Sequence, residues 1–360
     1  MSAMQITSSQ PTLSILVPVY NTGDLLEPCL QSLAAQSVEG IEFVCIDDGS
    51  RDDSGRILDI WAARDARFRV IHQANGGYGK AMNHGISAAR GEWIGIVEPD
   101  DWIEPTMYSH LMELARHTQA PVVKGSYTIE RHGATRQAGK FCTLTAGTEL
   151  APTDVPDYIL GSPSIWSAIY RRDWLQEHNI RFSETPGASY QDLGFGIRTW
   201  VAAHCVCVTP AGAYHYREDN PASSIRKLDE GAWAALRELE LQADVFAALP
   251  PDAKAKRSIL VRRILHTLQA DYRLRVSTRI PEYLAAYSSL LNRHFPLSTL
   301  NTGCFKKREW HDLQLLYSAP QSYPSRRKSN VSWLQRIYSC RREAGHRVLR
   351  IFGLTFHLSH

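Results

Sequence analysis

The segment Leu13-Ser-Ile-Leu-Val-Pro-Val-Tyr-Asn21 is an apolar run that ends in a polar turn. Two later segments repeat the arrangement: Glu42-Phe-Val-Cys-Ile-Asp-Asp-Gly-Ser50 and Glu92-Trp-Ile-Gly-Ile-Val-Glu-Pro-Asp-Asp101. Short apolar runs bounded by such turns predict buried parallel strands with helices between them. Ligands of these sheets bind at the carboxyl ends of the strands. Acidic side chains there suit a ribose, a base edge or a divalent metal better than a bare phosphate, so we expect a nucleotide handled through a metal.

The composition describes an ordinary globular chain. Its 360 residues are 44% hydrophobic and 21% charged, with a net charge of +3, which excludes a wholesale polyanion binder. Residues 321–360 hold eight Lys or Arg and one Glu, so this tail carries +7 and the remainder −4. The seven cysteines are scattered without a CxxC pair, which favours a reducing cytosol over a zinc site or a disulfide scaffold. Residues 1–12 lack an apolar leader segment, and no window approaches 18 apolar residues, so we expect neither a signal peptide nor a membrane span.

Hydrophobic spacing predicts an alternation of strands and helices up to about residue 226 and helices beyond it. In the first part, strands are expected at 13–20, 42–47, 68–72, 93–97, 121–127 and 205–208, and helices at 25–36, 54–65, 81–89 and 191–203. A strand-turn-helix pattern covers 164–177, while 128–163 is expected to contain loops. In the second part, helices are expected at 228–249, 253–275 and 281–295.

Acidic residues follow two of the predicted strands. Asp47 and Asp48 lie where a carboxylate can accept a hydrogen bond from a uracil N3–H, although an Asx turn that closes a strand uses the same residues. The turn Glu98-Pro-Asp-Asp101 offers oxygen ligands for a hard cation, whose shell a nucleotide's phosphates would complete. Acidic residues at the start of a helix are the alternative interpretation of this turn.

A glycine-rich loop, Asn75-Gly-Gly-Tyr-Gly-Lys80, follows the predicted strand 68–72. It begins like a dinucleotide-binding fingerprint, but Met82 stands in place of the third glycine, and the loop follows the third strand rather than the first. A dehydrogenase is therefore not predicted.

Taken in order, four of these segments resemble the inverting family 2 glycosyltransferases. They are Val17-Pro-Val-Tyr-Asn21, Ile46-Asp-Asp-Gly-Ser50, residues 75–83 and Glu98-Pro-Asp-Asp101. The resemblance implies an α/β fold of the GT-A type, a Rossmann-like nucleotide-binding domain with a mixed sheet, here followed by a C-terminal helical extension. It also implies a nucleotide-sugar donor, with uridine as the natural guess, and Mg²⁺ or Mn²⁺ as cofactor.

The resemblance also suggests a division of the chain. The predicted parts are an N-terminal tail, a GT-A domain with a nucleotide-sugar half and an acceptor half, a helical domain and a basic amphipathic tail. Their expected ranges are 1–11, 12–226 (12–127 and 128–226), 227–320 and 321–360.

At the nucleotide end, the resemblance implies that Asp47 and Asp48 meet the base. The end of the first strand, with Pro18, Tyr20 and Asn21, is expected beside the same base.

In the loop, Asn75, Gly77, Ala81 and Asn83 match the family pattern Asn-x-Gly-x-x-x-Ala-x-Asn. The family commonly has Arg before the last Asn, where this chain has Met82. Lys80 is expected to supply the missing cation, and Asn83 to lie in the nucleotide site. In the acidic turn, Glu98 and Asp100 are expected to contact the nucleotide, and Asp100 and Asp101 the metal.

Inversion requires a base that removes the proton of the acceptor hydroxyl. The family places this Asp in a Glu-Asp pair at a helix start, about 90 residues after the acidic turn. Tyr190-Gln-Asp192-Leu-Gly-Phe195 fits, with Gln191 in place of Glu. The resemblance therefore implies that Asp192 is the catalytic base and that Gln191 lies on the acceptor side, whereas a plain helix N-cap is the alternative for Asp192.

The segment from Tyr214 to Ser224 resembles the family's closing loop. His215 is expected to complete the metal shell and Arg217 to bind a phosphate bidentately; an unliganded loop histidine is the alternative. Trp166, predicted to contact the acceptor, and Trp200 would stack on sugar rings or belong to the core.

Basic and apolar residues interleave between 326 and 352. This pattern predicts an amphipathic helix that either lies on the anionic surface of the inner membrane or packs on the catalytic domain. The Gln-x-x-Arg-Trp motif and membrane spans of processive family members do not occur in the sequence, which favours transfer of one sugar per visit.

The sequence is thus interpreted as that of a cytoplasmic enzyme, or of one peripheral to the membrane, that acts as a non-processive hexosyl- or N-acetylhexosaminyltransferase. Its expected acceptor is a glycan or lipid-linked hydroxyl in lipopolysaccharide or capsule synthesis, at the cytoplasmic face of the membrane, and no nucleic acid partner is expected. A sugar nucleotidyltransferase would need a basic glycine-rich loop after the first strand, which residues 17–23 do not provide. A non-catalytic nucleotide-sugar binding protein is the second alternative, and the presence of Asp192 argues against it.

Overall fold

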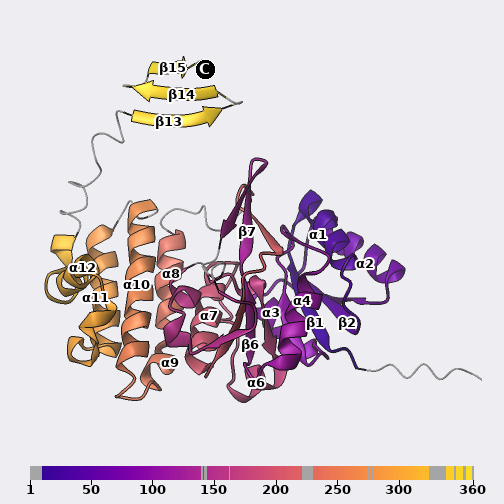
Figure 1. Cartoon of the computed structure of the whole chain (residues 1–360), viewed down its shortest axis with the longest axis horizontal. Coiled ribbons are helices and arrows are strands. Elements are labelled where there is room, and N and C mark those ends of the chain that lie inside the picture. Colours follow the sequence, from indigo (N-terminus) through magenta and orange to yellow (C-terminus); the bar gives the residue numbers. More distant parts are fainter. Residues whose placement is uncertain are drawn as a thin grey trace, which may run out of the picture.

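The computed structural model describes most of the chain. The described residues are 10–138, 141, 144–161, 163–220, 230–274, 276, 279–323, 338–343, 346–351 and 354–358. Figure 1 shows the N-terminal α/β part at one end and helices of the C-terminal part side by side at the other.

The N-terminal part is built on an eight-stranded mixed sheet with the order β3-β2-β1-β4-β10-β6-β11-β9. Its strands are β1 (Leu13–Val19), β2 (Ile41–Asp47), β3 (Phe68–His72), β4 (Trp93–Ile96), β6 (Val122–Gly125), β9 (Thr148–Leu150), β10 (Ala168–Arg171) and β11 (Val206–Thr209). Strands β3, β2, β1 and β4 are parallel, and β10 runs antiparallel between β4 and β6. The carboxyl ends of β1, β2 and β4 therefore meet at one edge.

Burial explains why these segments are strands. Every residue of β1, β2 and β4 is buried, as expected for parallel strands covered on both faces. Helix α3 packs on β1 and β2, α2 on β2 and β3, and α4 on β6. The helices of this part are α1 (Leu26–Ala34), α2 (Ser54–Arg64), α3 (Tyr78–Ala88), α4 (Met107–His117), α5 (Asp157–Leu160), α6 (Arg172–Glu177) and α7 (Gln191–Ala202).

A second, four-stranded sheet stands beside the first. Its order is β5-β12-β7-β8, with β5 (Trp102–Ile103), β7 (Tyr127–Arg131), β8 (Ala134–Ala138) and β12 (Tyr214–Arg217). The pair His215↔Trp102 brings β12 against the segment that follows β4. Loops were expected over 128–163, but this range contains most of β7, together with β8, β9 and α5. The hairpin was missed because its outer strand β8 is exposed and polar, which hides the hydrophobic alternation.

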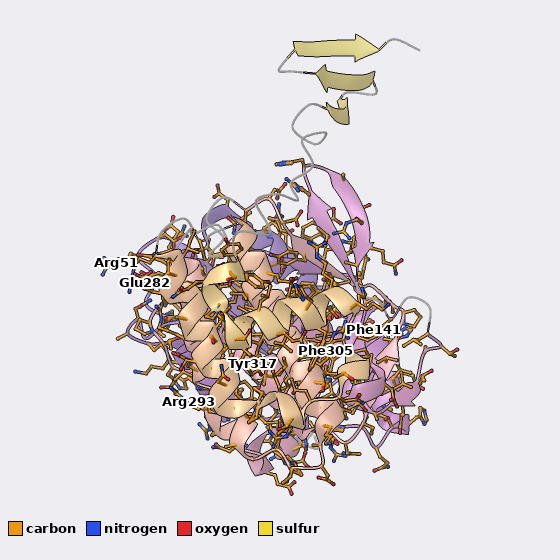
Figure 2. All side chains as sticks on the ribbon, turned by 90° about the vertical axis from the view of Figure 1, so that its left-hand side faces the viewer. Arg51, Phe141, Glu282, Arg293, Phe305 and Tyr317 are labelled. Carbon is orange, nitrogen blue, oxygen red and sulfur yellow. The ribbon has the colours of Figure 1, made fainter. Side chains whose placement is uncertain are left out.

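The C-terminal part is helical, as predicted. It consists of α8 (Glu230–Glu240), α9 (Ala243–Ala247), α10 (Lys254–Leu274), α11 (Ile280–His294) and α12 (Lys307–Ser318). The single helix expected at 228–249 is two helices, and α12 has no counterpart among the predicted ones. Figure 2 views the molecule from this end, where Phe305 packs on Trp310 with ring centroids 5.3 Å apart. The predicted boundary at residue 226 lies outside the described residues.

The tail differs from the prediction. An amphipathic helix was expected at 326–352, but the described parts are antiparallel strands: β13 (Tyr338–Glu343), β14 (His346–Ile351) and β15 (Leu354–Leu358). The helix prediction is therefore wrong over these strands, while 326–337 lies outside the described residues. The sequence places Gly345 and Gly353 between consecutive strands, a hairpin signal that outweighs helical spacing. In the part of the chain that the structure covers, no helix is both long and apolar enough to cross a bilayer.

Candidate active site

The glycine-rich loop is organised by Asp48, which is 3% exposed at the end of β2. Its carboxylate accepts hydrogen bonds from Gln73 Nε2 at 2.7 Å and from the backbone N–H groups of Gly76 and Gly77 at 2.8 Å each. Asn75 Nδ2 donates a fourth at 3.2 Å. A carboxylate has about four acceptor positions. The oxygens of Asp48 are thus filled by the loop in this structure, and its predicted contact with a base stays a prediction.

Asp47 is also bound by neighbouring residues. Its carboxylate accepts from Ser50 N at 2.9 Å and contacts His72 Nδ1 at 2.8 Å. Burial alone would raise the pKa of Asp47, but the hydrogen bonds from Ser50 and His72 lower it. The second ring nitrogen of His72 lies 3.0 Å from Asp59, and the two carboxylates raise the pKa of the imidazole. Asp47 is therefore held as a carboxylate at the strand end.

The end of β1 lies beside this turn, as the motif order suggested. Asn21 has a positive φ of 50°, donates its N–H to Ser50 Oγ at 3.1 Å and accepts from Arg51 N at 2.7 Å. Pro18 is buried within β1, beyond the last paired residues of β4, so its missing N–H breaks no bond to that strand. Tyr20 is 47% exposed, which leaves its ring accessible at the predicted nucleotide site.

Asn83 and Lys80 lie on α3 but differ in surroundings. Asn83 is buried and clamps the segment before α7: its amide donates to the oxygens of Phe182 and Glu184 at 2.9 Å and accepts from Phe182 N at 2.9 Å. Lys80 is exposed, and the described residues give it no ion-pair partner. Lys80 thus keeps a free charge at the loop, whereas the amide of Asn83 is committed to the fold.

Glu98 begins the acidic turn after β4 and is half-buried. The hydroxyl of Tyr78, the first residue of α3, donates to Glu98 Oε1 at 2.6 Å. Burial raises the pKa of Glu98 to about 8, with the charges of Asp100 and Asp192 adding to the rise. Tyr78 was not predicted as a site residue, since a tyrosine within a glycine loop gives no signal of its partner.

Asp100 and Asp101 have different environments. Asp101 is 1% exposed, and its two oxygens accept from the Tyr214 hydroxyl and from Arg217 N, both at 2.7 Å. Burial and the neighbouring Asp100 raise the pKa of Asp101 despite these bonds. Asp100 is half-buried, and within the described residues only its Oδ2 is engaged, by Asn220 Nδ2 at 2.7 Å. Asp101 therefore fastens the turn to β12, while Asp100 retains an oxygen for a ligand.

The three predicted metal ligands are not gathered. His215 has both ring nitrogens 2.8 Å from carboxylates, those of Glu130 and Glu104, and it stacks on Trp102. Among the described residues there is no cluster of three or more His, Cys, Asp or Glu side chains able to hold a metal. Asp101 and His215 are engaged in hydrogen bonds within the protein. Asp100 is therefore the predicted ligand that fits a cation best, and oxygens of a bound diphosphate would be needed to complete the coordination shell of the cation.

Arg217 lies at the edge of the acidic turn. Its guanidinium stands 5.1 Å above the Trp102 ring, and its Nε donates to the backbone oxygen of Asp100 at 3.0 Å. These contacts fix the side chain by Nε and leave the planar end of the guanidinium for a bidentate acceptor.

Trp166 belongs to an aromatic cluster and is 6% exposed. Its ring stacks on Tyr214 and Tyr216 with centroid distances of 4.1 and 5.4 Å and meets the edge of Tyr127 at 4.8 Å. Trp200 is fully buried, with Nε1 donating to Pro152 O at 3.0 Å. Both indoles are thus mainly core residues, and little of either ring is left for a sugar.

Asp192 lies in the first turn of α7 and is half-buried. Its Oδ1 accepts from Leu193 N at 2.8 Å, and the described residues provide no hydrogen bond to Oδ2. Burial raises the pKa of Asp192, against the opposing effects of the Leu193 N–H and the positive charge of Arg263. A carboxylate with one oxygen free and a raised pKa has the properties of a general base.

Gln191 shapes the loop before this helix. Its Nε2 donates to Thr185 Oγ1 at 2.8 Å and to Gly187 O at 3.2 Å, and its Oε1 accepts from Ser189 N at 2.6 Å. The loop in turn meets the glycine-rich loop, because Tyr78 N donates to Gly187 O at 3.0 Å. Gln191 is 2% exposed and orders the loop before α7, and its predicted contact with an acceptor stays a prediction.

A family model described as "Glycosyl transferase family 2" matches residues 14–178. This part of the chain is a family 2 glycosyltransferase domain. The resemblance predicted from the four motifs is therefore confirmed.

Relatives of this domain are glycosyltransferases of bacteria. The chain is 35% identical over 219 residues to the uncharacterized glycosyltransferase EpsJ of Bacillus subtilis, covering 59% of this chain and 62% of that protein. It is 33% identical over 196 residues to the uncharacterized glycosyltransferase YibD of Escherichia coli, covering 52% and 55%. The chain thus matches between 55% and 62% of the length of these two relatives.

The fold is shared with TarS of Staphylococcus aureus. Residues 1–349 of TarS, crystallised with UDP-GlcNAc, superpose with a TM-score of 0.75 at 18% identity, covering 97% of this chain and 99% of that one. The α/β fold of the GT-A type with a helical C-terminal region is therefore confirmed.

Two residues of the helical part, Arg263 and Glu238, lie close to α7 and to the segment before it, and nothing in the sequence indicated these contacts. Arg263 on α10 donates to Gly161 O at 2.6 Å, and its charge acts on Asp192. Glu238 on α8 accepts from Ser183 Oγ at 2.8 Å and lies directly against Gly194, where a side chain would overlap it. No local motif marks these residues, because their role depends on helix packing.

Proposed function

We propose that this protein is a non-processive, inverting glycosyltransferase that moves one hexosyl or N-acetylhexosaminyl group from a nucleotide-sugar to an acceptor hydroxyl. The donor is a UDP-sugar, and the acceptor is a glycan or lipid-linked hydroxyl of a surface polysaccharide. The family 2 domain supports the reaction class. The crystallisation of TarS, a protein of the same fold, with UDP-GlcNAc and with UDP supports the choice of uridine.

The observation that carries this proposal is the meeting of Asp192 with the acidic turn. Asp192 belongs to the acceptor half and Glu98 to the nucleotide half, yet the charge of Asp192 raises the pKa of both Glu98 and Tyr78. Tyr78, whose hydroxyl donates to Glu98, also donates its N–H to Gly187 O in the loop before α7. A sugar bound between the two halves would have a leaving diphosphate on the side of the turn and a base on the opposite side. Displacement with inversion needs this disposition.

Asp192 is proposed as the base. Its free Oδ2 would accept the proton of the acceptor hydroxyl as that oxygen attacks the anomeric carbon, while the bond from Leu193 N keeps the carboxylate oriented. The raised pKa makes this carboxylate a better proton acceptor than an exposed aspartate. Arg263 opposes the effect of burial and thereby favours an ionised Asp192 at neutral pH.

The diphosphate would lie between Arg217, Lys80 and Asp100. Arg217 and Lys80 would bind phosphate oxygens by charge-assisted hydrogen bonds. Asp100, one oxygen of which has no hydrogen bond from the described residues, would hold Mg²⁺ or Mn²⁺ together with the phosphates. When bound, such a cation neutralises charge that develops on the departing diphosphate.

Calorimetric titration of UDP tests the proposal, first with Mn²⁺ and then with EDTA, with CMP and NAD as competing ligands. UDP is expected to bind in the presence of Mn²⁺ and to bind at least about tenfold more weakly in EDTA, and Asp100→Ala is expected to abolish this difference. Binding of NAD in preference to UDP, or no nucleotide binding at all, would overturn the proposed function.

A further inference from the structure

Helix α10 of the C-terminal part carries a polar stripe. Arg263, Thr267 and Asp271 are spaced four residues apart and therefore share one face of the helix. Thr267 and Asp271 are 5% and 2% exposed. A buried carboxylate is costly unless hydrogen bonds compensate for lost water. Asp271 therefore requires partners, and two of them, Tyr190 and Tyr283, come from other elements.

One partner of Asp271 is Tyr190, the N-cap residue of α7. The Tyr190 hydroxyl donates to Asp271 Oδ1 at 2.9 Å, across 81 residues of sequence. On the other side, the Tyr283 hydroxyl of α11 lies 3.5 Å from Asp271 Oδ2. Asp271 thus joins α10 and α11 to the turn that precedes α7.

Tyr190 has a left-handed backbone, with φ of 64° and ψ of 9°. This conformation is unfavourable for a residue with a β-carbon and persists where the surroundings hold it. Its carbonyl oxygen accepts from Leu193 N at 3.0 Å and from Gly194 N at 3.4 Å, so Tyr190 is the N-cap from which α7 begins. The direction of Asp192, two residues later, depends on this turn.

We propose that Asp271 is a positioning residue for the catalytic base: it holds the Tyr190 hydroxyl, fixes the left-handed turn and thereby aims Asp192 between the two halves of the domain. The helical part is then a component of the catalytic unit rather than an appendage. This inference rests on the proposed role of Asp192, but the contact between Asp271 and Tyr190 can be tested without it.

The test compares Asp271→Ala, Asp271→Asn and Tyr190→Phe with Glu309→Ala. Asn keeps an acceptor for the Tyr190 hydroxyl, whereas Ala and Phe remove one side of the bond. Glu309 is a matched control, because it also binds residues of α10, namely Arg262 and His266, but has no bond to Tyr190. The measured quantities are kcat for release of UDP from UDP-GlcNAc, UDP affinity by calorimetry, and hydrogen–deuterium exchange of residues 188–194.

Asp271→Ala and Tyr190→Phe are expected to lower kcat by about 10–100-fold with UDP affinity within twofold of the wild type, since small misplacements of a catalytic group have effects of this size. Asp271→Asn is expected to stay within about threefold, and the double variant to be no slower than Asp271→Ala, because both changes break one interaction. Wild-type kcat in both single variants, multiplicative losses in the double variant, or an equal loss in Glu309→Ala would overturn the inference.

Hydrogen exchange separates this inference from the proposed function. If the wild type neither binds UDP nor releases it, the proposed function fails. Faster exchange of residues 188–194 in Asp271→Ala and Tyr190→Phe, but not in Glu309→Ala, would still support the positioning role. Unchanged exchange in the first two variants would overturn it whatever the activity.

Discussion

Replacement of Asp48 by Ala is expected to destabilise the protein strongly and to weaken UDP binding. The carboxylate accepts four hydrogen bonds, two from side-chain amides and two from the backbone of Gly76 and Gly77. Hydrogen bonds to a charged group contribute about 1.5–3 kcal/mol each. The two amides can turn to water, so the two backbone bonds dominate, and we expect a loss of about 3–5 kcal/mol in the free energy of unfolding.

Urea denaturation followed by calorimetry with UDP and Mn²⁺ measures both effects. Asp48→Asn keeps one acceptor oxygen and should lose about half as much stability. The control is Asp53→Ala, which removes an exposed pair with Arg56 and should leave stability nearly unchanged. A stability of Asp48→Ala within about 1 kcal/mol of the wild type would refute the assignment of Asp48 as the organiser of the loop.

Three further predictions concern packing and charge. Gly79→Ala would push a β-carbon into the backbone oxygen of Ser183 and should lower the free energy of unfolding, measured by urea denaturation, by about 1–3 kcal/mol. The control is Gly196→Ala, whose β-carbon would lie 3.7 Å from Pro163 Cβ and should be neutral or stabilising. Equal effects of the two changes would contradict the close approach of Gly79 to Ser183. Burial lowers the pKa of Lys124 to about 7, so the unfolded chain binds more protons than the folded one, and stability should rise between about pH 7 and the ordinary pKa of 10.5. Lys124→Met should reduce this slope by up to about 1.4 kcal/mol per pH unit. An unchanged slope would contradict the lowered pKa of Lys124. The hydrogen bonds to Asp47 and Asp59 raise the pKa of His72, so its contribution to stability is complete below the ordinary pKa of 6.5 and is lost as pH rises through the folded-state pKa. His72→Gln should therefore destabilise the protein more at about pH 6 than at alkaline pH, and the opposite order would exclude this pairing.

The central sheet could be predicted because its strands are continuous apolar runs with polar ends. Strand β3 and the start of α2 were expected at the residues where the structure has them. The helix predicted for the tail is wrong because the interleaved basic and apolar residues fit a strand period as well as a helical one. The glycines in the sequence between β13, β14 and β15 favour the strands. Helical spacing alone cannot separate these alternatives.

Motifs located the candidate site but not the partners of its side chains. The acidic turn was found from Glu98, Asp100 and Asp101, yet only the fold shows that Asp101 binds Tyr214, 113 residues away. The pairing of Tyr190 with Asp271 likewise depends on how α10 packs against α7. Contacts of this kind arise from tertiary structure, and a single sequence holds no local signal for them.

The most direct test of the account is the turnover of Asp192→Asn. Asn has nearly the same shape as Asp and can still accept the Leu193 N–H, so the fold and the donor site should be retained. We predict that release of UDP from UDP-sugars falls by about 100-fold or more while UDP affinity stays unchanged. Turnover at the wild-type rate in Asp192→Asn would contradict the assignment of the base and, with it, the mechanism proposed for this protein.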